Sequence, residues 1–337
     1  MPNHNNYLIS IVLPCYNGEN HLAAAIQSCL NQTHKNFELI IVNDCSSDNS
    51  LKIIAEYAKN DKRIVAINND VNKKLPATLN IGHNQAKGNF ITWTSDDNIL
   101  KSCFLECLIN SLLENQADIV YSNYDIITEN GSLKRIHITG PTEHLLYGNK
   151  IGASFLYKKE VFEELNGYNE SLFLLEDYDF WLRASIKFNF HHLDANLYQY
   201  RLHSDSLTSG IQHNKEKKSK HEKGVSEMFK KIADMFTWHT ITLNLLTENF
   251  LGQPIDVSNY LKESSIIKKD LLKFNPKKFD KAKVVFGLQL LLRNQIMTNN
   301  CDFKTLFEVL RKESTLLFHP SFSKKTTVNY IIKSVFH

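Results

Sequence analysis

Two adjacent carboxylates, Asp96 and Asp97, follow the short hydrophobic run Phe90–Trp93. Neighbouring carboxylates repel each other unless water or a cation neutralises them. A divalent metal held by one or two carboxylates and by diphosphate oxygens is the usual arrangement for nucleotide substrates. The pair therefore favours a metal site, while the plainer alternative is that one carboxylate caps the helix that follows.

Polar residues also follow two earlier hydrophobic runs. Tyr16 comes after Leu8–Leu13, and Asp44 comes after Phe37–Val42. An exposed aromatic ring in the first position could stack on a base. Taken alone, Tyr16 is equally well explained as an ordinary surface tyrosine. Taken alone, Asp44 is explained as a turn or cap residue.

A further acidic group opens a helix at Glu176–Asp179, and apolar residues such as Trp181 would bury that helix. The helix dipole favours carboxylates at this position for structural reasons alone. If one carboxylate faced the same crevice, it would suit deprotonation of an acceptor hydroxyl. His203 follows a strand-like segment, although a lone histidine is more often structural than a ligand.

The elements that must position these residues alternate between hydrophobic runs and helical patterns. This alternation predicts a parallel sheet with helices on both faces. Ligands bind such sheets at the carboxyl ends of the strands, so three strand ends should meet at one crevice. The expected strands are 8–13, 37–42, 64–67 and 90–93, and the expected helices are 19–31, 47–59, one between 67 and 90, and 101–115.

The pattern changes near residue 210. Before it we expect a strand at 118–122, a hairpin at Asn130-Gly131, a loop over 139–150, a strand at 152–157 and helices at 159–165 and 176–188. Beyond it, Lys-rich helical patterns cover 215–236, 257–273, 279–298, 303–312 and 325–336, with 212–218 as the linker. At 337 residues two domains are expected. We predict an α/β domain over 1–210 and a basic helical region over 211–337.

The charge is distributed unevenly between these two parts. Hydrophobic residues at 42% and charged residues at 22% are ordinary globular values that exclude a disordered or fibrous chain. The net charge of +3 combines −7 over residues 1–210 with +10 over 211–337. The basic region favours an anionic surface, such as phospholipid headgroups or a phosphorylated acceptor, and a solvated face of a helical bundle is an equal alternative. Nucleic acid is not expected, because no nucleic-acid-binding signature accompanies the charge.

The six cysteines show neither a CxxC pair nor a zinc-type spacing, and we expect reduced thiols in the core. The first residues lack the pattern of a signal peptide, and no stretch approaches about 18 consecutive apolar residues. We therefore expect a cytoplasmic protein, with the basic region as the part that would rest on the inner face of a membrane.

Taken together, these motifs resemble the inverting family 2 glycosyltransferases of the GT-A fold. The resemblance covers roughly residues 7–208 and does not extend to the basic region. The matching segments are 11–17, 40–48, Asn80 with 86–91, 95–97, 155–162 with Gly167-Tyr168, 176–183 and 200–203.

The resemblance implies a site for a nucleotide-sugar donor, usually a UDP-sugar, together with Mn²⁺ or Mg²⁺. Tyr16 and Asp44 would hold the base, Asp96 would approach the ribose, and Asp97 would bind the metal. His203 would be an additional contact, to the metal or to the diphosphate. The full set implied for the donor is Pro14, Tyr16, Asn17, Asp44, Asn80 and Asp96.

On the acceptor side, Asp177 would be the general base, and Glu176 and Trp181 would shape the site. The family context implies a bacterial enzyme that transfers a hexose or N-acetylhexosamine to a hydroxyl of a glycan or lipid-linked acceptor. Its product would be a surface polysaccharide such as capsule or O-antigen.

Three positions depart from the family pattern. Asn43 stands where the family often has Asp, Cys45 where it often has Gly, and Leu79 where a basic residue commonly precedes Asn80. The missing base leaves a diphosphate or uracil contact open, which Lys73 or Lys74 would have to supply.

Two other classes of function remain as alternatives. A nucleotidyltransferase would normally have a Gly-rich loop after the first strand, and Pro14–Gly18 contains one glycine. Dinucleotide oxidoreductases fail the same test, because no GxGxxG follows a strand. A non-catalytic nucleotide-sugar-binding scaffold would not need Asp44, Asp96, Asp97 and Asp177 together.

Overall fold

The computed structural model describes residues 6–204, 206, 215–275, 277–299 and 302–336. It divides into two compact units. The first comprises Met1–Pro141 and Asn149–His221, and the second comprises Thr142–Gly148 and Glu222–His337. Residues 211–214, at the expected domain boundary and linker, lie outside the described part of the chain, whereas residues 215–218 already belong to a helix.

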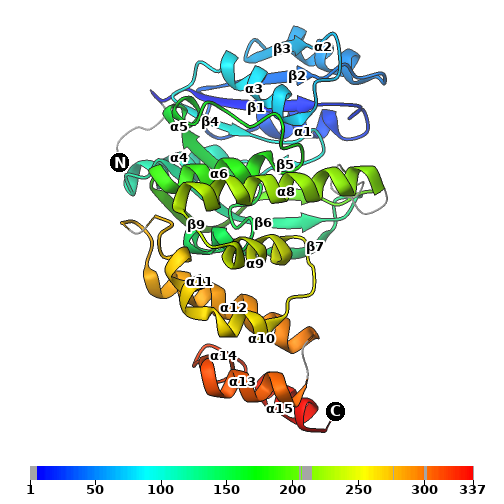
Figure 1. Cartoon of the computed structure of the whole chain (residues 1–337). Coiled ribbons are helices and arrows are strands. Elements are labelled where there is room, and N and C mark those ends of the chain that lie inside the picture. Colours follow the sequence, from blue (N-terminus) through cyan, green and yellow to red (C-terminus); the bar gives the residue numbers. More distant parts are fainter. Residues whose placement is uncertain (1–5, 205, 207–214, 276, 300–301, 337) are drawn as a thin grey trace. The chain divides into compact units, whose positions relative to one another are not determined.

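The first unit is built on a mixed sheet with the order β3-β2-β1-β4-β8-β6-β9-β5, and β7 pairs with β6 (Figure 1). β3, β2, β1 and β4 run parallel to one another, as the strand and helix alternation predicts. The strands are β1 (Ile9–Cys15), β2 (Phe37–Asn43), β3 (Ile64–Asn68), β4 (Phe90–Trp93), β5 (Ile99–Leu100), β6 (Ile119–Ile127), β7 (Leu133–His137), β8 (Phe155–Lys158) and β9 (Phe190–Arg201).

The other strands pair mostly antiparallel, with β6 and β9 as a parallel pair. The hairpin expected at Asn130-Gly131 joins β6 to β7. β6 and β9 are longer than expected, and their shared register contains irregularities near Ser122 and Asn123. Such irregularities interrupt the alternation of side chains from which strand ends are predicted.

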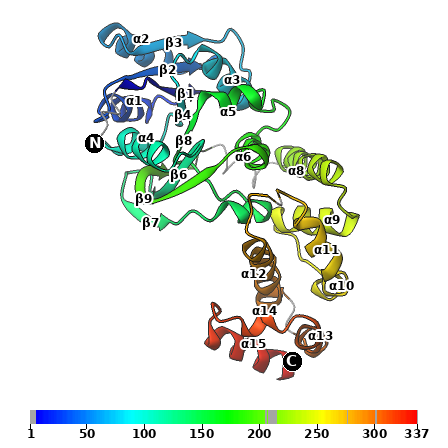
Figure 2. The same ribbon diagram turned by 90° about the vertical axis from the view of Figure 1, so that its left-hand side faces the viewer.

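Helices cover both faces of the sheet (Figures 1 and 2). Alternate residues of β1 point to opposite faces. Ile9, Ile11 and Leu13 join a core with α1 and α4, while Val12 lies beside Gly82 of α3 on the other face. The helices are α1 (Leu22–Leu30), α2 (Ser50–Asn60), α3 (Leu75–Gln85), α4 (Phe104–Glu114), α5 (Lys159–Glu164) and α6 (Glu176–Lys187).

The second unit is helical in its described residues. Its elements are η2 (Thr142–Tyr147), a 3-10 helix, and α8 (Lys215–Phe236), whose first residues are grouped with the first unit, followed by α9 (Thr240–Phe250), α10 (Val257–Lys262), α11 (Ser264–Leu271), α12 (Lys281–Asn299), α13 (Phe303–Lys312), α14 (Thr315–Phe318) and α15 (Lys324–Phe336).

Three details of this unit differ from the sequence prediction. The helix expected over 257–273 is divided into α10 and α11 at Glu263. α9 was not expected, because β-branched residues such as Thr240 and Ile241 weaken the helical signal in the sequence. In the structure, the burial of Leu245 and Leu246 outweighs this low helix propensity. η2 occupies part of the segment 139–150, which was predicted to be a loop.

The cysteines meet the expectation of reduced core thiols only in part. Cys15 and Cys29 are buried as expected, but Cys45 is an exposed free thiol, because it lies in a loop after β2 instead of in the core. Cys301 lies outside the described residues.

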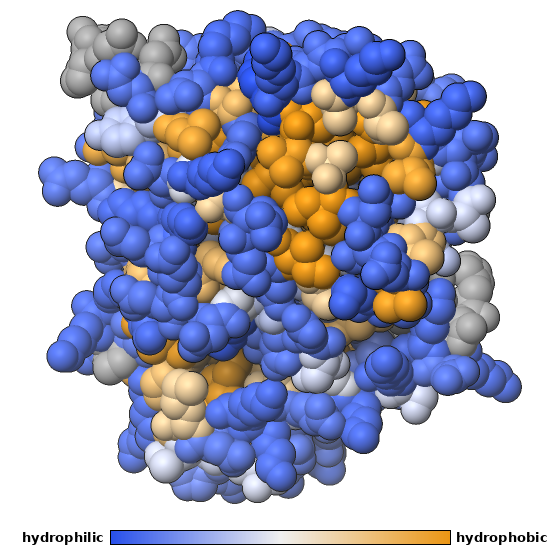
Figure 3. Space-filling view, turned by 90° about the horizontal axis from the view of Figure 1, so that it is seen from above, coloured by the Kyte–Doolittle hydropathy of each residue, from blue (hydrophilic) through white to orange (hydrophobic). Residues whose placement is uncertain are grey.

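None of the helices in the described part of the chain combines the length and hydrophobicity needed to cross a bilayer. The face drawn in Figure 3 is largely polar, with hydrophobic side chains gathered in one broad patch.

Candidate active site at the strand ends

The loops after β1 and β2 are held together by their own polar side chains. The backbone N–H of Asn17 donates to Ser46 Oγ at 3.0 Å, and Asn17 Oδ1 accepts from the N–H of Ser47 at 2.8 Å. Asn17 and Cys45 both adopt left-handed backbone conformations, with φ of 55° and 61°. This conformation favours glycine, which explains why the family often has Gly at the position of Cys45.

Asp44 is buried at the end of β2, where its carboxylate fixes a neighbouring loop. Oδ1 accepts from Asn69 Nδ2 and from the backbone N–H of Lys73, both at 2.8 Å. Oδ2 accepts from the backbone N–H of Lys74 at 2.9 Å. The carboxylate therefore shapes the 69–74 loop and does not cap α2, which was the alternative reading.

Asp96 lies beside the loop after β1. Its Oδ2 accepts from the backbone N–H of Tyr16 at 3.2 Å, and a Cβ added at Gly18 would lie 2.4 Å from the same oxygen. Burial and the neighbouring Asp97 raise the pKa of Asp96 to about 7. Only a glycine allows the loop to approach this carboxylate so closely, while the Tyr16 ring above the loop remains exposed.

Asp97 forms a pair with His203, the residue for which the motifs implied an additional contact. Asp97 Oδ2 lies 2.9 Å from His203 Nε2, and the two side chains come from segments separated by 106 residues. Asp97 Oδ1 is buried and accepts no hydrogen bond from the residues that the structure describes. Arg201 supports this turn, since its Nε donates to the backbone carbonyl of Asp97 at 2.9 Å.

This pair fits a divalent metal. A buried carboxylate oxygen without a hydrogen bond, next to an imidazole nitrogen, is a donor set that suits Mn²⁺ or Mg²⁺. Among the described residues, no group of three or more His, Cys, Asp or Glu side chains is arranged to hold a metal. The protein would thus supply two ligands at most from this pair, and diphosphate oxygens or water would have to supply the others.

A second acidic cluster lies at the start of α6. Asp177 Oδ2 accepts from Asn149 Nδ2 at 2.8 Å, and Oδ1 accepts from the backbone N–H of Tyr178 at 2.7 Å. Burial raises the pKa of Asp177, and these two hydrogen bonds oppose that rise. Glu176 is buried, and burial together with Asp177 raises its pKa to about 8. The two carboxylates therefore differ in hydrogen bonding although they are adjacent.

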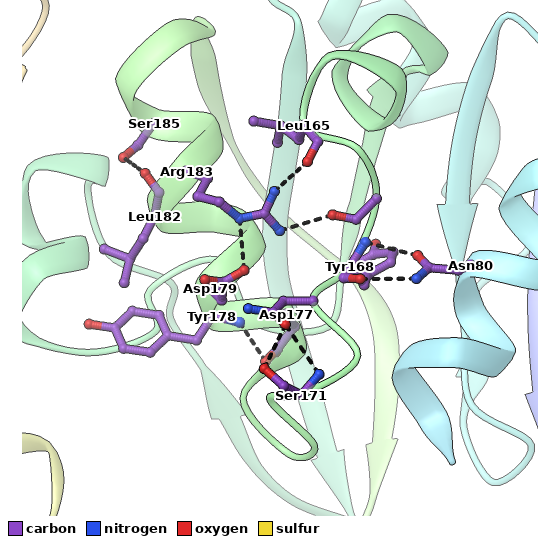
Figure 4. Close-up of polar contacts among 12 residues, drawn as sticks. Asn80, Leu165, Tyr168, Ser171, Asp177, Tyr178, Asp179, Leu182, Arg183 and Ser185 are labelled. Atoms are coloured by element: carbon purple, nitrogen blue, oxygen red, sulfur yellow. Dashed lines mark hydrogen bonds and ion pairs between the residues drawn. The ribbon is translucent and has the colours of Figure 1, made fainter. Parts of the chain in front are cut away.

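Asn80 and Asp179 hold the segment that leads into α6 (Figure 4). Asn80 Nδ2 donates to the carbonyl of Tyr168 at 2.9 Å, and its Oδ1 accepts from the N–H of Tyr168 at 2.8 Å. Asp179 pairs with Arg183, whose guanidinium donates to the carbonyl of Leu165 at 2.7 Å. Both amide atoms of Asn80 are therefore engaged with the protein.

Trp181 is fully buried and lies in an aromatic cluster. Its ring meets Phe155 and Tyr157 at centroid distances of 4.7 and 5.9 Å. A side chain in this position can set the position of α6 but cannot touch an acceptor. Pro14, also buried, pairs with Val42 between β1 and β2 and has a similar supporting place.

The structure thus joins Tyr16, Asp96, Asp97 and His203 by direct contacts or adjacency, with Asp44 on the neighbouring strand end. Sequence reasoning missed Asn149, because it lies in a segment without periodicity. Arg201 lies in the matching segment 200–203, but no role was predicted for it. No local signal could show that its guanidinium reaches Asp97.

A family model described as glycosyl transferase family 2 matches residues 10–172. An uncharacterized glycosyltransferase of Haemophilus influenzae is 34% identical over 179 residues, which make up 52% of this chain and 70% of that protein. The chain belongs to glycosyl transferase family 2. The enzyme class inferred from the motifs is therefore confirmed at the level of the family.

Two relatives of this family 2 chain have more specific names. The UDP-Glc:alpha-D-GlcNAc-diphosphoundecaprenol beta-1,3-glucosyltransferase WfgD of Escherichia coli is 30% identical over 208 residues, covering 60% of this chain and 81% of WfgD. Glycosyltransferase GlyA of Streptococcus pneumoniae is 31% identical over 229 residues, covering 59% of this chain and 31% of GlyA. The chain spans less than half the length of several relatives that it matches, GlyA among them.

A solved structure supports the fold of this family 2 chain. The crystal structure of S. aureus TarS 1-349 in complex with UDP has a TM-score of 0.56 and 15% identity, and covers 97% of this chain and 90% of that one. At this identity the likeness bears on the fold alone. The GT-A fold predicted from the motifs, followed by C-terminal helices, is confirmed.

Proposed function

We propose that this family 2 chain transfers a sugar from a UDP-sugar to a hydroxyl of a glycan or lipid-linked acceptor, with inversion at the anomeric carbon. The acceptor class is supported by the name of WfgD, whose acceptor is a diphosphoundecaprenol-linked sugar. The UDP donor is supported by the same name and by the UDP complex of TarS. The products would be surface polysaccharides such as capsule or O-antigen.

The observation that carries this proposal is the arrangement at three neighbouring strand ends. β2, β1 and β4 are adjacent and parallel, so Asp44, Tyr16 and Asp96 end at the same edge of the sheet. In our proposal, Tyr16 stacks on the base, Asp44 and the loop that it fixes bind the base edge, and Asp96 accepts from the ribose. Pro14 and Asn17 shape the loop after β1. Asn80 is proposed to position Tyr168 and its neighbours without touching the donor.

Asp97 and His203 are proposed to hold a divalent metal. When bound, the metal would supply the positive charge that neutralises the departing nucleoside diphosphate. Asp97 Oδ1 accepts no hydrogen bond from the described residues, and His203 Nε2 lies 2.9 Å from the other oxygen. Arg201 fixes the backbone of Asp97, so that the ligand does not depend on loop motion.

Asp177 is proposed to be the general base. A carboxylate whose pKa is raised by burial accepts a proton more readily than an exposed one. It would remove the proton of the acceptor hydroxyl while the hydroxyl oxygen attacks the anomeric carbon from the side opposite to the leaving diphosphate. Asn149 holds one carboxylate oxygen and leaves the orientation of Asp177 defined. Glu176 would line the acceptor side, and Trp181 would support it from within the core.

Binding of the donor can be tested without knowledge of the acceptor. A ligand that binds only the folded state raises stability by RT ln(1 + [L]/Kd), so thermal shifts with UDP, GDP, CDP and their sugar conjugates, with and without Mn²⁺, should reveal the donor. We expect a metal-dependent shift with UDP or a UDP-sugar. Absence of a shift with every nucleotide would contradict the proposal.

The general base requires a separate test. Asp177→Asn should abolish transfer and leave the affinity for UDP unchanged by calorimetry, whereas Asp44→Ala should weaken UDP binding first. Loss of UDP affinity in Asp177→Asn would show that Asp177 belongs to the donor side.

We also propose a cytoplasmic enzyme that works at the inner face of a membrane. A lipid-linked acceptor would be presented there. The net charge of +10 over residues 211–337 favours approach to an anionic surface.

A further inference from the structure

α13 is amphipathic, and its apolar side is wider than the part that packs inside the second unit. Thr305, Leu306 and Val309 are buried within the second unit. Beside them on the helix surface, Phe303, Phe307 and Leu310 are 63%, 58% and 44% exposed. These three residues lie at spacings of four and three, so they form one stripe along the helix. A helix at the surface of a globular protein normally turns polar residues outward.

α15 repeats this arrangement. Val328, Ile332 and Val335 have the same spacing and are 53%, 50% and 50% exposed. Thr327 and Tyr330 are buried on its other side, and Arg293 of α12 donates to Thr327 Oγ1 at 3.0 Å. The inner face of α15 is thus fixed by contacts, and its apolar stripe faces away from the core.

The two helices contact each other within the second unit (Figure 2). We call the six exposed residues of their stripes, Phe303, Phe307, Leu310, Val328, Ile332 and Val335, the α13–α15 face. Exposed apolar clusters of this kind are rare on soluble monomers and mark sites that another surface covers.

Charged residues indicate which surface that is. Residues 302–336 contain six Lys or Arg and three Asp or Glu. Two of the acids are used inside the unit, since Asp302 caps α13 by accepting from the N–H of Thr305 at 2.8 Å and Glu313 pairs with Lys268. Of the bases, Lys304, Arg311, Lys324, Lys325 and Lys333 are exposed.

Several of these bases lie next to the stripes. Lys304 lies three residues before Phe307 and Arg311 four residues after it, so both flank the stripe of α13. Lys324 precedes Val328 by four residues and therefore lies on the same side of α15. Apolar side chains beside Lys and Arg are the pattern with which interfacial helices enter the headgroup region of anionic bilayers. A second copy of the chain would instead bring two basic rims together, which repel each other.

We propose that the α13–α15 face docks on an anionic phospholipid bilayer, with its aromatic and aliphatic side chains in the headgroup region and its bases on lipid phosphates. This inference rests on the proposed function in one respect: a lipid-linked acceptor would lie at the same membrane surface. It assigns membrane contact to two helices at the end of the basic region, instead of to its charge as a whole.

Vesicle co-sedimentation of the full chain tests this proposal. The chain should bind phosphatidylcholine vesicles that contain phosphatidylglycerol and should not bind pure phosphatidylcholine. The double variant Phe303→Ser with Phe307→Ser should reduce binding by about tenfold or more. Lys304→Glu with Arg311→Glu should reduce it similarly and should weaken its dependence on salt.

The matched control replaces two exposed apolar residues of the first unit. Leu133→Ser with Ile138→Ser removes side chains that are 61% and 66% exposed, and vesicle binding should be unchanged. All substituted side chains are exposed, and the far-ultraviolet circular dichroism of each variant should match that of the parent. UDP binding, measured in the same variants, should also be unchanged.

Several outcomes would overturn the proposal. The parent chain could fail to bind anionic vesicles at low ionic strength, or both α13 variants could bind them as well as the parent does. The parent could also be a dimer that Phe303→Ser with Phe307→Ser dissociates. The last result would identify a second copy as the occupant. Vesicle binding without any nucleotide binding would refute the proposed function alone, and nucleotide binding without vesicle binding would refute this inference alone.

Discussion

Asp177 and Asn149 form the contact on which the chemistry of the proposed base depends. The amide Nδ2 of Asn149 donates to Asp177 Oδ2 and stabilises the ionised carboxylate. Burial acts in the opposite direction and raises the pKa of Asp177. The protonation state of the base is therefore set by the balance between burial and the hydrogen bonds from the Tyr178 N–H and from Asn149.

Asn149→Ala removes one of the two hydrogen bonds that oppose this rise and should raise the pKa of Asp177 further. A general base works only when deprotonated, so activity falls as the pH drops through this pKa. The acidic limb of the pH profile of kcat should consequently move to higher pH, while activity at the alkaline plateau should fall by less than about tenfold. Asn115→Ala is the control, because its Nδ2 donates only to the carbonyl of Ser111 in the same region of α4. An acidic limb that stays in place would contradict the assignment of Asp177 as base.

Glu176 offers a second prediction at this scale. Its pKa is raised to about 8 by burial and by Asp177, so below that pH the side chain is a neutral acid. Glutamine has the same shape and charge as the protonated form. Glu176→Gln should therefore keep kcat at pH 7 within about threefold of the parent, whereas the profiles should separate above pH 8, where only the parent ionises. A loss of activity at every pH would mean that the ionised form of Glu176 is required.

At the scale of elements, the side chain of Asn80 links α3 to the segment before α6 by hydrogen bonds. Asn80 exchanges two hydrogen bonds with the backbone of Tyr168 and a third with Glu170 Oε1 at 3.0 Å. This link connects a helix on the parallel half of the sheet with the segment that leads to Asp177. It explains why an asparagine in the middle of α3 belongs to the motif set.

Asn80→Ala should lower kcat and leave the UDP affinity nearly unchanged. The N–H and the carbonyl of Tyr168 would lose their partners, and we expect a loss of about 1–3 kcal/mol in the free energy of unfolding. Calorimetry with UDP and steady-state kinetics would separate the two roles that Asn80 could have. A selective loss of UDP affinity would instead support the direct donor contact implied by the family motifs.

The elements near the site were largely predictable, because their signals are local. Hydrophobic runs fixed β1, β2 and β4 within a residue or two, and acidic residues marked the start of α6. β5 was not predictable, since Ile99–Leu100 is only a two-residue strand held by β9. Asn149 and Arg201 depend on contacts across 28 and more than 70 residues, for which a single sequence carries no signal.

At the scale of the whole molecule, the chain has two units, each with its own buried core. Core residues of the first include Ile11 and Leu105, and those of the second include Phe229 and Leu245. The motifs covered the first unit alone, and the second was foreseen only as basic helices. Its outward apolar stripes went unnoticed, because a stripe facing solvent and a stripe facing a core have the same periodicity in the sequence.

This division predicts two transitions in differential scanning calorimetry. UDP with Mn²⁺ binds at the strand ends of the first unit, so only the transition of that unit should rise. At a hundredfold excess over Kd the gain is about 2.7 kcal/mol, which corresponds to a rise in Tm of roughly 5 °C or more. Asp270→Asn identifies the other transition, because this fully buried carboxylate of the second unit accepts from the N–H of His239 and from Thr242 Oγ1. The substitution should lower the second transition and leave both the first transition and its response to UDP unchanged. A single transition, or an equal shift of both transitions by UDP, would show that the helical unit unfolds together with the donor site and would contradict this division.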